Sequence, residues 1–164
     1  MENTVDTQKF PEIWSRVTSV DAVPASSEVA PERDEDGTLR SLLDREAHGL
    51  ARYRALSARF PHGAQGGTFR QLVQDEISCI RQLQLRYYLL VGDSYTPPRM
   101  GPESALPLTA LRAAYAGETE KASLYREAAV RTRDGKLQTL YADLSDRALR
   151  RAERLESALS AAMR

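Results

Sequence analysis

The residues with the clearest chemical potential in this sequence are three glutamates that interrupt apolar helical seams, Glu46, Glu76 and Glu118. Each has an apolar residue about one turn before it and another about one turn after it, as Glu46 has Leu43 and Leu50. Residues at this spacing share one helix face, so all three carboxylates are expected to point into a core. A buried carboxylate without a partner is costly, so the sequence predicts a compensating positive charge, from a metal ion or from basic side chains.

The helices that would carry these glutamates can be recognised from apolar residues that recur at steps of three and four. The first run is ended by Pro61, and the second has Thr68 as its expected N-cap and Gly92 after its last residue. Four long helices are expected, at about residues 39–60, 68–91, 104–133 and 136–163.

The connections between these helices are expected to be short, long and short. The middle one, DSYTPPRMGPE at residues 93–103, holds three prolines and a glycine and cannot be helical throughout. A crossover of this length lets the second helix pair run back alongside the first, which distinguishes this topology from a simple up-and-down bundle.

The first and third helices are similar to each other in sequence. Residues 39–59 align without a gap with residues 111–131, and this alignment matches Glu46 with Glu118 and Tyr53 with Tyr125. An internal duplication of a helix pair is the economical explanation.

Three stretches resemble the helices of rubrerythrin-like members of the ferritin-like superfamily: DREAHGLARYRAL, QDEISCIRQLQLRYYLLVGD and AGETEKASLYREAA. That family has a Glu with a Tyr seven residues later on helices one and three, and Asp-Glu-x-x-His on helices two and four. The resemblance covers about residues 38–160. It implies an all-α, ferritin-like four-helix bundle with a long crossover, and a di-iron carboxylate site, with iron or manganese as cofactor, used in peroxide reduction or iron oxidation.

The sequence departs from the family pattern at the ligand positions. Cys79 stands where the second helix should have its His, and a thiolate is a softer ligand than imidazole. On the fourth helix the same alignment puts Leu144 at the Glu position and Arg147 at the His position. A register shifted by one residue would offer Asp143 and Asp146 instead, beside the seam rather than on it.

Two functional interpretations follow from these departures. In the preferred one the metals have been lost, and Arg147, with Arg151 one turn later, pairs with the three carboxylates in a non-catalytic bundle protein. In the alternative one a metal site survives on Glu46, Glu76 and Glu118, with Cys79 as a further ligand, in an oxidoreductase. No catalytic residue beyond these metal ligands is predicted.

The chain is expected to divide at residue 37, with an irregular or disordered tail at 1–36 and the bundle at 37–164. The tail contains three prolines, an acidic run, and the apolar residues Phe10, Ile13 and Trp14. These apolar residues are expected to dock on the bundle as a short helical turn, and the alternative is that they bind a protein partner. The family resemblance also implies a homodimer.

Composition argues against two classes of partner. The chain has 23 basic and 23 acidic residues, whereas nucleic acids and anionic membranes select for a basic excess. The apolar runs are too short to span a bilayer, and the first residues lack the apolar core of a signal peptide. With a single cysteine, Cys79, the chain is expected to be cytoplasmic.

Overall fold

The structure, a computed structural model, describes residues 34–101 and 106–163. These residues form four helices and no strand: α2 (Glu35–Arg59), α3 (Gly63–Val91), α4 (Pro107–Arg131) and α5 (Gly135–Ala162). The predicted all-α four-helix bundle is therefore confirmed. The predictions about Phe10, Ile13 and Trp14 fall outside the described residues.

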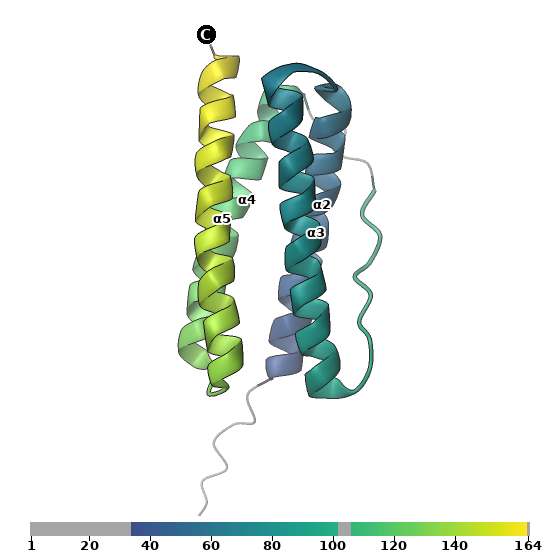
Figure 1. The fold of residues 1–164 in the computed structure, drawn as a ribbon, viewed down its shortest axis with the longest axis vertical. Helices are drawn as coiled ribbons and strands as arrows, with labels where there is room; N and C mark the ends of the chain where they lie inside the picture. The colour runs from purple at the N-terminus through teal and green to yellow at the C-terminus, as the bar shows by residue number, and fades with distance from the viewer. Residues whose placement is uncertain (1–33, 102–105, 164) are drawn as a thin grey trace, which may run out of the picture. The chain divides into compact units, whose positions relative to one another are not determined.

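The predicted order of connections is also confirmed. Short turns join α2 to α3 and α4 to α5, and Figure 1 shows the first described residues of the crossover running back along the outside of the α2 and α3 pair. Tyr95 anchors this segment, because its hydroxyl donates to Asp44 Oδ1 at 2.8 Å and its ring lies 5.7 Å from that of Tyr87. As a result α4 runs antiparallel to α2, and α5 runs antiparallel to α3 (Figure 1).

Three helix starts differ from the prediction. The start of α2 is Glu35 rather than residue 39, inside the predicted irregular tail, because Asp34 caps the helix by accepting from the Gly37 N–H. The start of α3 is Gly63 rather than Thr68, because the turn folds back so tightly that a Cβ at Gly66 would collide with the carbonyl oxygen of Phe60. Thr68 is not an N-cap but lies inside the helix, where its hydroxyl donates to the Ala64 carbonyl at 3.1 Å. The start of α4 is Pro107 rather than residue 104, at the first helical position, where the missing N–H of proline costs nothing.

The core consists of two apolar clusters, one toward each end of the bundle. One includes Leu43, Leu83 and Tyr125, and the other includes Leu56, Phe69 and Leu155. Between them lies a layer of buried charged side chains, contributed by the middle of all four helices: Glu46, Glu76, Glu118, Lys121 and Arg151. Among the described helices, none combines the length and apolar character needed to cross a membrane.

Candidate functional site: a buried charge cluster

The three glutamates meet in the middle of the bundle around the ammonium group of Lys121. Their side chains are almost completely buried, and they come from α2, α3 and α4. Lys121 Nζ lies 3.2 Å from Glu46 Oε2, 2.5 Å from Glu76 Oε1 and 2.6 Å from Glu118 Oε1. An ammonium group carries three protons, so one lysine serves all three carboxylates at once.

Arg151 brings a second cation to the cluster from α5. It is 1% exposed, and its Nε lies 2.9 Å from Glu118 Oε2 and 3.4 Å from Glu76 Oε2. Its Nη1 donates to Cys79 Sγ at 3.3 Å, and its Nη2 lies 3.7 Å from Glu46 Oε1 without a hydrogen bond. The guanidinium group therefore closes the α5 side of the cluster.

Two tyrosines complete the cluster in a crossed arrangement. The Tyr53 hydroxyl on α2 donates to Glu118 Oε1 on α4 at 2.6 Å, and the Tyr125 hydroxyl on α4 donates to Glu46 Oε1 on α2 at 2.5 Å. The internal sequence alignment matches Glu46 with Glu118 and Tyr53 with Tyr125. The two hydrogen bonds therefore join equivalent positions of the two helices in opposite directions. The two aligned helices, α2 and α4, thus face each other antiparallel with matched positions in contact.

The charges leave the cluster with one acid in excess, since three glutamates face two cations. Burial and the charge of Glu46 raise the pKa of Glu76 well above 4.5, against the effect of Lys121 and Arg151. Burial also acts to raise the pKa of Glu46, but Lys121, Arg151 and hydrogen bonds from Glu76 and Tyr125 outweigh it and hold that pKa at about 2. We therefore assign a proton to Glu76, which makes the cluster neutral.

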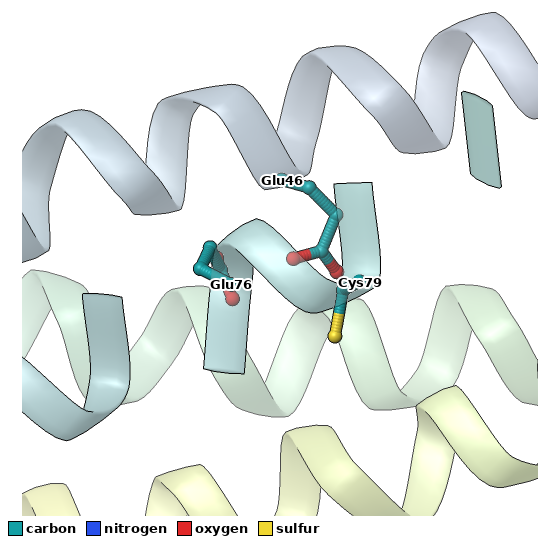
Figure 2. Close-up of side chains that lie close together, drawn as sticks. All are labelled: Glu46, Glu76 and Cys79. Atoms are coloured by element: carbon teal, nitrogen blue, oxygen red, sulfur yellow. The ribbon is translucent and has the colours of Figure 1, made fainter. Parts of the chain in front are cut away.

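The potential metal ligands are brought together only in part. One ligand atom from each of Glu46, Glu76 and Cys79 lies within 4.8 Å of the others, and Figure 2 shows Glu46 reaching from α2 toward the other two on α3. Burial raises the pKa of the Cys79 thiol to about 12, and Glu118 is not part of this group. Metal binding by these residues stays a prediction.

The donor set does not fit a pair of metal ions. Two irons require about eight to ten ligand atoms, and the four side chains that the sequence offers supply fewer. Both cationic groups already stand between the carboxylates, and Lys121 or Arg151 contacts each of them. A thiol with a raised pKa is also a poor metal ligand, because the ligand form is the thiolate.

The prediction for Arg147 is wrong. Its guanidinium is partly exposed and lies outside the cluster, 3.7 Å from Asp143 Oδ2, with a long bond of 3.5 Å to the Asp75 carbonyl. The role falls to Arg151, one turn further along α5, because that turn is level with the glutamates. Leu144 is buried in an apolar cluster as the alignment expects, while Asp143 and Asp146 are exposed and offer nothing to the site.

Sequence reasoning missed Lys121 entirely. The signal was present, since Glu118 and Lys121 are three residues apart on one helix face. The internal alignment adds a second signal, because Lys121 corresponds to Gly49 in the first helix. A Cβ at Gly49 would collide with Glu76 Oε1 and lie 3.0 Å from Lys121 Nζ, so the glycine makes room for the lysine across the pseudo-symmetric site.

A pocket connects this cluster with the surface between α2 and α4. Its volume is about 210 Å³, and Gly49 and Gly117 contribute to its lining. It reaches Lys121, Glu118 and Tyr53 at its inner end. Small molecules therefore have a route to the cluster from the α2 and α4 side.

No protein-family model, no curated protein and no solved structure matches this chain.

Proposed function

We propose that this protein is a non-catalytic bundle of the ferritin-like type in which two basic side chains stand in for the metal ions of a di-iron site. The observation that carries the proposal is the position of Lys121, whose ammonium group contacts all three buried glutamates. A divalent metal in such a bundle would be held by the same carboxylates from several helices. Lys121 meets their need for positive charge without a metal.

The crossed tyrosine bonds and the helix order support the relationship to ferritin-like bundles. Tyr53 and Tyr125 each bond the glutamate of the other helix, and both stand seven residues after a Glu, as in the rubrerythrin-like pattern. Arg151 supports the loss of catalysis, because its guanidinium fills the α5 side, where the family pattern has metal ligands. On this proposal the chain keeps the scaffold for an interaction or structural role.

Metal content is the direct test. The wild-type protein would be produced with iron and manganese supplied, purified without chelator, and analysed by mass spectrometry beside a Lys121→Met variant. We expect the wild type to hold far less than one metal per chain, since both cationic groups occupy the cluster. The Lys121→Met variant should hold more metal than the wild type, because it exposes three carboxylates with only Arg151 to balance them.

A control variant, Glu76→Ala, separates specific from adventitious metal. Two metals per wild-type chain that are lost in Glu76→Ala would overturn the proposal. If Lys121→Met does not fold, the wild-type metal content still decides the question.

A second candidate function is a metal-binding oxidoreductase, and one observation favours it. Ligand atoms of Glu46, Glu76 and Cys79 already lie within 4.8 Å of one another, and iron or manganese would need only to displace Lys121. The pocket between α2 and α4 would admit the ion and a peroxide. Metal-dependent peroxide consumption by the wild type, absent in Glu76→Ala, would establish this function.

A further inference from the structure

On the opposite side of the bundle, a second cleft opens between α3 and α5. Its volume is about 280 Å³, and it is lined by Asp75, Asp143, Arg147, Arg150, Arg151 and Arg154. Neighbouring helices of a bundle normally close such a space with apolar side chains. Here every side chain that lines the space is charged, which indicates a polar ligand rather than packing.

The arginines of this cleft lie on one face of α5, because their spacing is three and four residues. The two aspartates balance only part of their charge. Asp75 Oδ2 lies 2.8 Å from Arg154 Nη1, and Asp143 Oδ2 lies 3.7 Å from Arg147 Nη1. Arg150 has neither a hydrogen bond nor an ion pair with any residue that the structure describes.

Arg151 forms the inner wall of the cleft, and its guanidinium nitrogens face the buried cluster. It is 1% exposed, and its Nη2 has no hydrogen-bond partner among the described residues. Its Nε donates to Glu118 Oε2 and its Nη1 to Cys79 Sγ, while Nη2 lies 3.7 Å from Glu46 Oε1. A ligand in the cleft would therefore meet the more exposed Arg150 and Arg154, while Arg151 adds its positive charge from beneath.

We propose that this cleft binds a small soluble anion through a phosphate group, with Arg150 and Arg154 as the main contacts. Guanidinium groups bind phosphate oxygens in pairs of parallel hydrogen bonds, which makes arginine the preferred residue for this chemistry. Asp75 holds Arg154 in place, so the cleft is partly preorganised. The space between the two helices, about 280 Å³, suits a small molecule.

Pyrophosphate is the probe for the test. Its binding to the full-length protein would be measured by isothermal titration calorimetry in a buffer of low chloride content. We expect saturable binding of one pyrophosphate per chain, and a loss of affinity of at least about tenfold in the variant Arg150→Gln/Arg154→Gln, since each charge-assisted hydrogen bond is strong. The matched control is Arg112→Gln/Arg133→Gln, which removes the same charge from exposed positions outside the cleft.

Three outcomes would overturn the proposal. They are an absence of saturable binding, an equal loss of affinity in the control variant, and retention of affinity in the cleft variant. A second arm would replace pyrophosphate with phosphatidylglycerol vesicles in a sedimentation assay. Vesicle binding that depends on Arg150 and Arg154, without pyrophosphate binding, would assign the phosphate to a lipid headgroup and reject the soluble ligand. Arg150→Gln alone repeats the test if the double variant unfolds.

Discussion

At the scale of single residues, the charged side chains in the core balance one another by number and by geometry. Lys121 serves three carboxylates, Arg151 serves two of them and the Cys79 sulfur, and one proton on Glu76 makes up the difference. Removing one member of a buried ion pair is costly, because it leaves a charge without a partner. Substitutions that leave a charge in this cluster without a partner should therefore have larger effects than substitutions at exposed arginines.

Arg151→Ala should lower the free energy of unfolding by about 3–5 kcal/mol, because it leaves Glu118 with an unpaired carboxylate oxygen in the core. The neighbouring substitution Arg147→Ala should cost less than about 1 kcal/mol, since its ion pair is partly exposed and long. Urea unfolding followed by circular dichroism measures both. Equal losses in the two variants would contradict the assignment of Arg151 to the cluster.

Because the cluster has one acid more than it has cations, we expect the loss of one acid to be tolerated and the loss of a second acid to be costly. Glu76→Gln should change the free energy of unfolding by less than about 1 kcal/mol, because it replaces a protonated acid with an amide of similar shape. Adding Glu46→Gln should cost about 3–5 kcal/mol more, since two cations then face a single acid. A double variant no less stable than Glu76→Gln would show that the two cations do not need both remaining acids.

At the scale of elements, the close approach of α2 to the cluster depends on a small residue. Gly49 faces Glu76 on α3 and Lys121 on α4, and its missing side chain leaves the space for the hydrogen bond between them. The aligned position on α4 carries Lys121 itself, so the two helices differ at the one pair of positions where a second side chain would crowd the lysine. The site is therefore asymmetric because α2 supplies a glycine at the position where α4 supplies a lysine.

Gly49→Ala should destabilise the protein, because the new Cβ would collide with the Glu76 carboxylate and disturb its pairing with Lys121. The matched control is Gly67→Ala in α3, where nothing lies within 4 Å of the added Cβ. This control should raise stability by up to about 1 kcal/mol through helix propensity. Thermal unfolding of both variants would reveal the opposite signs, and stabilisation by Gly49→Ala would show that the space is not needed.

At the scale of the whole molecule, the raised pKa of Glu76 and the lowered pKa of Glu46 make folding dependent on pH. Both start from 4.5 in the unfolded chain. The contribution of Glu46 is present above pH 4.5 and is lost as the pH falls toward about 2. The contribution of Glu76 is present below pH 4.5 and is lost as the pH rises toward its raised folded pKa.

Stability should therefore decrease from about pH 5 toward neutral pH, because the folded chain binds one more proton than the unfolded chain. One such proton corresponds to about 1.4 kcal/mol per pH unit. Urea unfolding of the wild type and of Glu76→Gln across pH 5–8 measures the difference between their slopes. Identical slopes in the two proteins would mean that Glu76 is ionised in the folded state.

Near the C-terminal end of α3, apolar side chains are exposed at Leu85, Tyr88, Leu89, Leu90 and Val91. Nothing in the structure shows what covers them. Homodimerisation, and the binding of a partner by the residues before α2, both stay predictions.

The sequence by itself determined the four helices, the long crossover and the burial of the three glutamates. The helices and the burial of the glutamates are local features, because the fixed rotation per residue of a helix shows which side chains share a face. The crossover follows from the length of the middle connection. The match of Glu46 with Glu118 and of Tyr53 with Tyr125 could also be read from the sequence, whereas the crossed bonds between these residues appear only in the structure.

Only the tertiary structure decided which basic groups reach the carboxylates. Arg147 and Arg151 lie one turn apart on α5, and the axial offset between α5 and its neighbours selects the second. That offset depends on the packing of the two apolar clusters rather than on any local pattern. The role of Lys121 likewise depends on the space beside Gly49 on another helix, which no reading of α4 alone could show.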